Sequence, residues 1–255
     1  MRLITVFIAA ILAWECFAAD YDKLEAKAER FVAFQEWNSA NAMYLLMMDM
    51  RPDKAVNYAR AIVTSGMMAD DDAQMSLLER TQRQGMALDS VFTEVRDFSF
   101  EIGCSREYER FLILVKERQP WMARHINTRL LKYYDFRNDA PEMVAIGNEL
   151  LSATPDEIGY ISIVARGYMI LGEFERAVAY YNRILALDDC NYAALLALGN
   201  YNYVMWKASE GTRSQLTSTA MKALEFLQRA YELSPTPFVS KVMEELKAAY
   251  PNAHR

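Results

Sequence analysis

Small and large apolar side chains recur at helical spacing through residues 161–191, whose sequence is ISIVARGYMILGEFERAVAYYNRILALDDCN. One face of each of two helices carries them: Val164, Ala165 and Tyr168 in the first, and Ala177, Tyr181 and Ile184 in the second. Leu171, Gly172 and Glu173 separate the two runs and predict a turn. Because large and small residues at these offsets let two antiparallel helices interlock, the pattern predicts a helical hairpin.

The same pattern returns at a step of about 34 residues along the chain. It predicts helix pairs near residues 21–54, 55–88, 89–123, 124–157, 158–191 and 192–235, with one extra residue in the third pair. The second pair fits least well, because the polar Gln74 stands at the small-or-apolar anchor position of its second helix.

Four prolines fall in one phase of this repeat. Pro52, Pro120, Pro155 and Pro235 each follow the anchor residue of a second helix by twelve residues. The four anchors are Ala40, Tyr108, Met143 and Ala223. Proline at this position ends one helix and prepares the chain for the next, so the prolines support the repeat boundaries independently of the apolar pattern.

In its small-residue, tyrosine, glycine and alanine positions, the segment 158–191 resembles the tetratricopeptide repeat, a 34-residue helix-turn-helix unit. The closing proline of that family is replaced by Asp189. The resemblance extends over about residues 21–235 and implies an all-α fold, an α-solenoid of about six helix pairs. Such pairs cannot bury their apolar faces alone, so we expect them to stack side by side within residues 20–250.

The end of the chain departs from the repeat. The last pair is about twelve residues too long, and the surplus falls in the mostly polar segment 207–218, KASEGTRSQLTS. Residues 237–250, PFVSKVMEELKAAY, have the pattern of an amphipathic helix. Because the last pair of a repeat array otherwise exposes its apolar stacking face, we expect this segment to form a C-terminal capping helix.

The resemblance also implies a binding surface. In tetratricopeptide repeats the first helix of each pair lines a concave groove, through residues one, four, eight and eleven places after the helix begins. The eighth places here are Glu29, Val63, Asp97, Lys132, Arg166 and Asn200, and the eleventh places in the third to sixth pairs are Phe100, Asp135, Met169 and Tyr203. We therefore predict a partner-binding groove that contains His125, Thr128, Lys132, Asp135, Arg166, Met169, Asn200 and Tyr203.

Such a groove is acidic towards its N-terminal end, with Lys132, Arg166 and Asn200 towards the other end. It suits an extended peptide, held by its backbone and by an acidic side chain or a C-terminal carboxylate. Asp135 counts against capture of a carboxylate, because it can neutralise one of the neighbouring cations.

Composition narrows the classes of function. The chain has 255 residues, 53% of them hydrophobic, with only nine glycines and seven prolines, which are few turn residues for an all-β protein of this length. Its formal charge of −6, with both signs spread along the chain, argues against nucleic acid as a partner.

The first nineteen residues read as a cleaved signal peptide. Arg2 precedes a run from Leu3 to Trp14 that is apolar apart from Thr5, and small residues allow cleavage after Ala18 or Ala19. Glu15 stands directly before Cys16, where a lipoprotein signal requires a small residue, so lipidation is not expected. The run is too short for a membrane span, which needs about 20 apolar residues, so we expect an exported, periplasmic or extracytoplasmic protein with no span after cleavage.

No motif for catalysis, metal or cofactor binding is present. The two histidines, His125 and His254, cannot build a usual zinc site, and no nucleophile has a histidine base nearby in sequence. Cys104 and Cys190 fall in turns at opposite ends of their helices, so we predict two free thiols. The chain is therefore interpreted as a non-enzyme without a cofactor.

The sequence favours a protein–protein interaction module that binds a protein or peptide partner. One alternative is an accessory subunit of envelope assembly, similar to the outer-membrane assembly lipoproteins that contain such repeats, although the lipid attachment signal is missing. Another is an enzyme or glycan binder with a dispersed site. A glycan site would need exposed tryptophans, whereas Trp37, Trp121 and Trp206 fall near helix junctions, where we expect them to pack.

Overall fold

The structure is a computed structural model that describes residues 20–208 and 212–249. The predicted signal peptide, residues 1–19, lies outside the described residues, as do residues 209–211 of the polar segment 207–218 and the last predicted helical residue, Tyr250. All regular secondary structure in the described ranges is helical, which confirms the predicted all-α fold for these residues.

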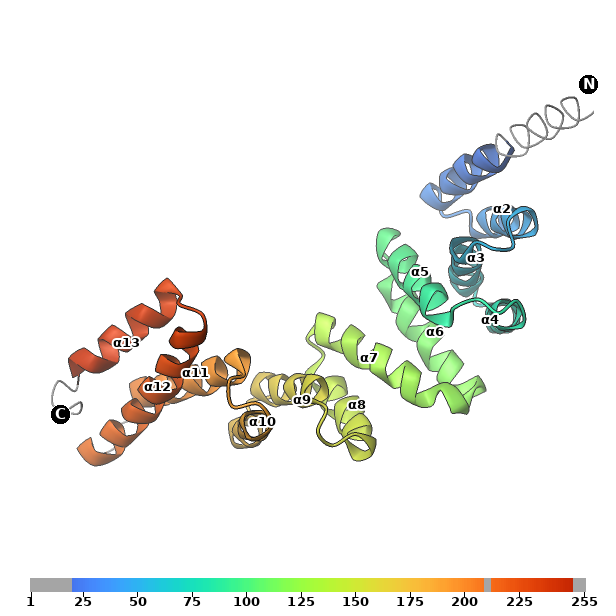
Figure 1. Ribbon diagram of the computed structural model, residues 1–255. Helices are drawn as coiled ribbons and strands as arrows, with labels where there is room; N and C mark the ends of the chain where they lie inside the picture. Colours follow the sequence, from blue (N-terminus) through green and yellow to red (C-terminus); the bar gives the residue numbers. More distant parts are fainter. Residues whose placement is uncertain (1–19, 209–211, 250–255) are drawn as a thin grey trace, which may run out of the picture. The chain divides into compact units, whose positions relative to one another are not determined.

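The helices come in consecutive pairs, followed by one more helix (Figure 1). In the described chain the first helix covers residues 20–33. It pairs with α2 (Trp37–Met50), and the later pairs are α3 (Ala55–Met67) with α4 (Asp71–Arg83), α5 (Leu88–Glu101) with α6 (Ser105–Arg118), α7 (Ala123–Arg137) with α8 (Ala140–Ala153), α9 (Ile158–Ile170) with α10 (Phe174–Leu187), and α11 (Tyr192–Ala208) with α12 (Arg213–Leu233). A short 3-10 helix, η1 (Pro120–Met122), precedes α7, and α13 (Pro237–Ala249) follows the last pair. This order confirms the predicted fold of tetratricopeptide-like helix pairs with an added C-terminal helix.

One residue with positive φ lies in the short turn of each of the first five pairs. These residues are Gln35, Ala69, Gly103, Asn138 and Gly172, with φ between 53° and 76°. In every case the next backbone N–H donates to the carbonyl five residues back, as from Glu173 to Tyr168 at 2.9 Å. This bond satisfies a carbonyl that the end of the first helix leaves free, and it turns the chain into the second helix.

The four prolines in repeat phase all end second helices. Pro52, Pro120, Pro155 and Pro235 each lie two residues beyond the last residue of a helix, which is Met50, Arg118, Ala153 or Leu233. Proline lacks an N–H and biases the residue before it away from helical geometry, so none of these helices continues further.

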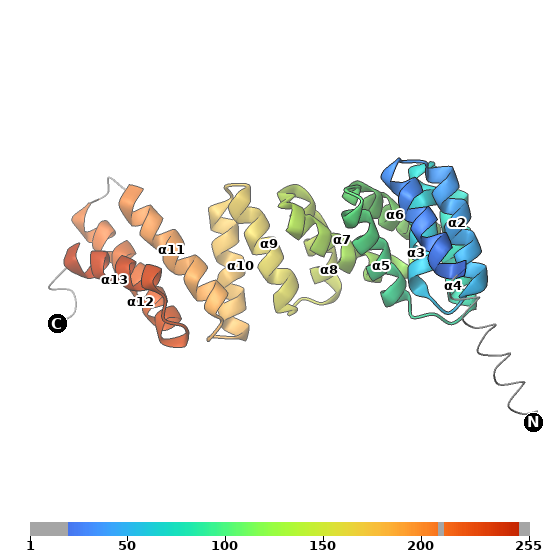
Figure 2. The same ribbon diagram turned by 90° about the horizontal axis from the view of Figure 1, so that it is seen from above.

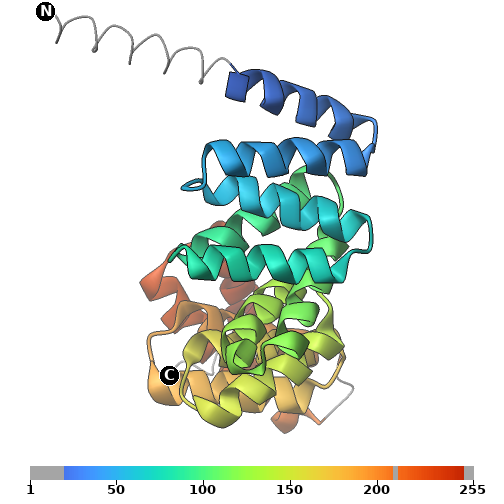
Figure 3. The same ribbon diagram turned by 90° about the vertical axis from the view of Figure 1, so that its right-hand side faces the viewer.

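The first compact unit comprises the described residues 20–126. Within it α3 contacts α2, α4, α5 and α6, and Figure 3 shows the successive N-terminal helices of this unit in layers. The core contains large aromatic side chains: Tyr58, Phe92 and Phe111 are fully buried, and the ring centroids of Phe92 and Phe111 lie 5.8 Å apart. Apolar burial between adjacent helix pairs therefore forms this core.

Gln74, which fits the repeat poorly, belongs to a buried polar network in this unit. Its Nε2 donates to Ile62 O at 3.0 Å and to Glu107 Oε1 at 2.9 Å, and Arg110 in turn donates to Glu107. A Cβ on Gly66 would lie 1.7 Å from Glu107 Oε1, so only glycine leaves room for this carboxylate. The polar anchor is thus fully hydrogen-bonded rather than a weak point of the repeat.

The second compact unit comprises the described residues 127–208 and 212–249. Its α9 packs between α8 and α10, α11 packs on α12, and α13 packs on α12, as Figure 2 shows for the yellow to red helices. The apolar face of α13 is buried against α12 through Val239, Val242, Met243 and Leu246. The predicted helix at the end of the chain therefore covers apolar surface of the preceding pair.

The positive φ of Ala69 gives a testable prediction about stability. Ala69→Gly is expected to raise the free energy of unfolding by about 1 kcal/mol, because the left-handed region costs an L-residue roughly 1–2 kcal/mol and costs glycine little. Ala42→Gly, on an exposed position within α2, is the matched control and should lower stability by about 1 kcal/mol. Urea unfolding followed by circular dichroism measures both, and two changes of the same sign would contradict this account of the turn.

Candidate functional site

The predicted groove positions of the second unit lie along the first helices of its pairs. Lys132 on α7 and Arg166 on α9 are exposed, and Asn200 on α11 is half-buried. Asp135 and Met169, one helical turn further on, are also half-buried. The first helix of each pair is called its A helix. We call the predicted positions on these helices the A-helix strip: Lys132 and Asp135 on α7, Arg166 and Met169 on α9, and Asn200 and Tyr203 on α11.

An ion pair joins two neighbouring helices of the strip. Arg166 donates from Nη2 to a carboxylate oxygen of Asp135, and the same nitrogen lies 2.7 Å from the backbone oxygen of Asp135. Burial raises the pKa of Asp135, while the positive charge of Arg166 opposes that shift. Lys132 forms no ion pair within residues 20–208 and 212–249, so of the two cations Lys132 is the one available to a ligand.

Tyr203 is already bound to another part of the second unit. Its hydroxyl donates to Glu245 Oε2 on α13 at 2.6 Å, and Lys207 Nζ lies 2.9 Å from the other carboxylate oxygen. The hydrogen bond from Tyr203 and the ion pair with Lys207 lower the pKa of Glu245. Tyr203 therefore takes part in holding α13 against α11.

His125 and Thr128, the first two predicted groove residues, each contact a neighbouring helix. Thr128 shares a hydrogen bond of 3.0 Å with the hydroxyl of Tyr160, which links α7 to α9 within the second unit. His125 falls in the first unit, where its Nε2 lies 3.4 Å from Asp89 Oδ1 and its ring packs on Phe92. The structure thus places seven of the eight predicted residues in the second unit and His125 in the first.

The strip also has an apolar side that the sequence analysis missed. Phe136, Ile170 and Val204, again 34 residues apart, are 68%, 49% and 59% exposed. Each directly follows a predicted groove residue, namely Asp135, Met169 or Tyr203. Inspection of the next position in each repeat would therefore have found them. Exposed aliphatic and aromatic side chains in a repeated row are typical of a protein-binding surface.

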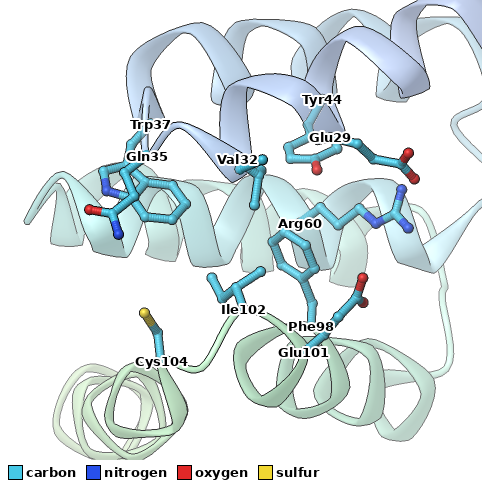
Figure 4. A pocket seen from close by; sticks show the side chains of 11 residues that line it. Glu29, Val32, Gln35, Trp37, Tyr44, Arg60, Phe98, Glu101, Ile102 and Cys104 are labelled. Atoms are coloured by element: carbon cyan, nitrogen blue, oxygen red, sulfur yellow. The ribbon is translucent and has the colours of Figure 1, made fainter.

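The first unit contains a pocket of about 560 Å³ between the first helix, α3 and α5 (Figure 4). At one end lie the charged side chains of Glu29, Arg60 and Glu101. Val32 and Ile102 line its middle, and the other end has Trp37, Gln35 and Cys104. The pocket is therefore polar and charged at one end and largely apolar along its middle.

Arg60 is fixed in place by its neighbours in the pocket. Its Nη1 donates to Glu25 Oε1 at 2.7 Å, and its guanidinium carbon lies 5.7 Å from the ring centroids of both Tyr44 and Phe98. The charge–ring contacts and the ion pair act together, so the guanidinium has little freedom to turn towards a ligand. Glu29 and Glu101 remain exposed on either side of it.

Tyr44 has a buried hydroxyl at the edge of the pocket. Its side chain is 0% exposed and lies beside Arg60, and its oxygen has no hydrogen-bond partner within residues 20–208 and 212–249. Burial is the main cause that raises the pKa of Tyr44 to about 12. A buried hydroxyl normally has a partner, because desolvation without one costs about 1–3 kcal/mol.

Of these pocket residues, only Glu29 was among the predicted groove positions. Val63, its counterpart on α3, is fully buried and lines no groove, so that position was predicted wrongly. The expectation that all three tryptophans pack at helix junctions is also wrong for Trp121, which is 72% exposed. Arg60 and Tyr44 were missed because no spacing rule shows which buried side chains find partners on other helices.

Three general properties of the described residues bear on function. None of the helices within residues 20–208 and 212–249 has both the length and the apolarity that a bilayer crossing requires. In the same ranges no three histidine, cysteine or acidic side chains come together as a metal-binding group. Cys104 and Cys190 are free thiols, as predicted.

No family model matches the chain, and no curated protein does. Among solved structures, a proposed protein-binding protein from Bacteroides ovatus is 15% identical, with a TM-score of 0.48 over 77% of this chain and 97% of that one. The C-terminal part of a tetratricopeptide-repeat protein from Cytophaga hutchinsonii is 11% identical, with a TM-score of 0.47 over 88% and 95%. A tetratricopeptide-repeat domain of yeast Sti1, in its pHSP90 complex, is 12% identical, with a TM-score of 0.38 over 90% and 99%. These likenesses are too distant to carry a function.

The raised pKa of Tyr44 predicts a loss of stability in alkali. The folded chain keeps the phenol protonated above pH 10, where the unfolded chain loses the proton, so stability falls as the pH rises from 10 towards 12. Between pH 9 and pH 11 the wild type should lose about 1 kcal/mol more of its free energy of unfolding than Tyr44→Phe does. Urea unfolding at both pH values measures the difference, and equal losses in the two proteins would contradict it.

Proposed function

We propose that this chain is an extracytoplasmic protein–protein interaction module that binds an extended protein or peptide segment along the A-helix strip of its second unit. The observation that carries the proposal is the exposed row of side chains on α7, α9 and α11. Such a row offers a repeated contact every helix pair, which suits a ligand that runs across the helices.

The strip combines two kinds of contact. Phe136, Ile170 and Val204 provide apolar surface, whose burial supplies most of the free energy of association. Lys132 adds an exposed positive charge beside them, whereas Arg166 is engaged with Asp135. We infer that the partner segment is apolar with an acidic group that meets Lys132, and that binding rather than catalysis is the role of the chain.

The setting that we propose is the periplasm or another extracytoplasmic space. The apolar run from Leu3 to Trp14 with a small-residue cleavage site supports export, and the glutamate before Cys16 supports release without a lipid. An accessory role in envelope assembly is compatible with this setting, but nothing in the strip favours it over other partners.

Partner capture tests the strip directly. Mature protein carrying Ile170→Ser or Lys132→Glu is immobilised in an envelope extract of the source organism, and the captured proteins are quantified against the wild type by mass spectrometry. We expect at least one protein to decrease about tenfold with either variant, which corresponds to ~1.4 kcal/mol of binding free energy.

The matched controls change the same chemistry away from the strip. Leu187→Ser on α10 removes an apolar side chain of nearly equal exposure, 45% against 49% for Ile170. Lys222→Glu reverses an exposed charge on α12. If the controls reduce capture as much as the strip variants, or if no captured protein changes at all, the strip is not the binding surface.

Export is tested by the mass of the chain recovered from its native compartment. We expect an N-terminus at Ala19 or Asp20 and a mass without added lipid, in the fraction released by osmotic shock. Recovery of the chain with Met1 in the cytoplasmic fraction, or of a lipid-modified Cys16 in the membrane, would contradict the proposed setting.

A further inference from the structure

We propose that the pocket of the first unit binds the cationic side chain of a lysine or arginine presented by an extended peptide. In this arrangement Glu29 and Glu101 receive the charged group, and Val32, Ile102 and Phe98 contact its apolar stem. This site lies in the first unit, whereas the A-helix strip lies in the second, so either can fail without the other.

The balance of charge favours a cation. Glu25 and Glu101 act on the single guanidinium of Arg60, Glu29 lies at the same end of the pocket, and Glu25 alone is paired with Arg60. Glu29 and Glu101 are exposed and form no ion pair within the described parts of the chain. An anionic ligand would have to displace Glu25 from Arg60 and meet two further negative charges. A cation meets two free carboxylates, and the positive charge of Arg60 beside them is offset by its pairing with Glu25.

The unbonded hydroxyl of Tyr44 is an independent sign of a missing ligand. It is fully buried at the charged end of the pocket, and Figure 4 shows the Tyr44 ring beside Glu29 and above Arg60. Because a phenol oxygen accepts as well as donates, it is able to accept a hydrogen bond from an ammonium or guanidinium N–H that reaches the charged end of the pocket beside Arg60. Its desolvation is then compensated only in the bound state.

The apolar middle of the pocket selects a cation on a hydrocarbon stem. Val32 and Ile102 face each other there, and the Phe98 ring lies between them and the charged end. Lysine and arginine side chains bury such stems along apolar surface while their charged ends stay near polar groups. A small inorganic cation would leave this middle part unfilled.

Calorimetric titration of the mature protein with three blocked pentapeptides tests the proposal. The peptides are Ac-Ala-Leu-Lys-Leu-Ala-NH₂ and its analogues with norleucine or glutamate in place of lysine. We expect the lysine peptide to bind at least about tenfold more tightly than the norleucine peptide, and the glutamate peptide to bind most weakly.

Two variants separate a binding role from a structural one. Glu29→Gln/Glu101→Gln keeps shape and removes both charges, and should lower the affinity for the lysine peptide about tenfold, while Glu79→Gln on the exposed face of α4 should leave it unchanged. Tyr44→Phe should lower that affinity severalfold while the unfolding midpoint in urea stays the same or rises, since no native hydrogen bond is lost.

Four results would overturn the assignment. Equal affinity for the lysine and norleucine peptides, or no measurable binding of the lysine peptide, would exclude a cation site. If Glu79→Gln lowered the affinity as much as Glu29→Gln/Glu101→Gln, the loss would come from the net charge of the protein and not from this pocket. Binding of n-butylammonium as tightly as the lysine peptide would assign the pocket to a free amine rather than to a peptide side chain.

Discussion

The left-handed turn within each helix pair is the constraint on which the rest of the structure depends. Gln35, Ala69, Gly103, Asn138 and Gly172 hold this conformation at steps of 34 or 35 residues, and each turn is closed by the same backbone hydrogen bond. The turn fixes the direction in which the second helix leaves the first, and therefore which faces of the two helices are buried together. Only two of the five residues are glycines, so at the other three positions the packing of the pair offsets the backbone strain.

Packing between pairs tolerates polar anchors as long as every polar atom is bonded. In the first unit Gln74 replaces the usual small residue, and Glu107 on α6 and Arg110 surround it with hydrogen bonds. The network can form only because Gly66 leaves room beside Glu107. It therefore requires Gly66 on α3, Gln74 on α4 and Glu107 on α6 together. Such a network specifies which helices become neighbours, since an unmatched carboxylate in the same place would be buried without a partner.

The fold could be predicted from the sequence because its determinants are local and repeated. The turn at Gly172, the prolines that follow second helices and the apolar face of residues 237–249 all act within one or two helices of their own position. The candidate sites were less predictable, because they depend on which side chains find partners across helices. Tyr203 bonds to Glu245, and Arg166 pairs with Asp135, in both cases across 31 or more positions of the sequence. The hydroxyl of Tyr44, by contrast, has no partner among the described residues. No spacing rule in the sequence predicts any of these outcomes.

The two units therefore differ in how their surfaces are prepared for a ligand. In the second unit Arg166, Tyr203 and Thr128 already have partners, whereas the buried Oδ1 of Asn200 has none among the described residues. The rest of that surface is apolar, with one free charge at Lys132. In the first unit the pocket keeps a buried hydroxyl unbonded and two carboxylates unpaired around a fixed guanidinium. Because a buried hydroxyl without a partner costs free energy, a ligand that bonds to it would remove that cost on binding. The apolar strip then suits a ligand that is recognised by shape, and the pocket suits one that is recognised by charge.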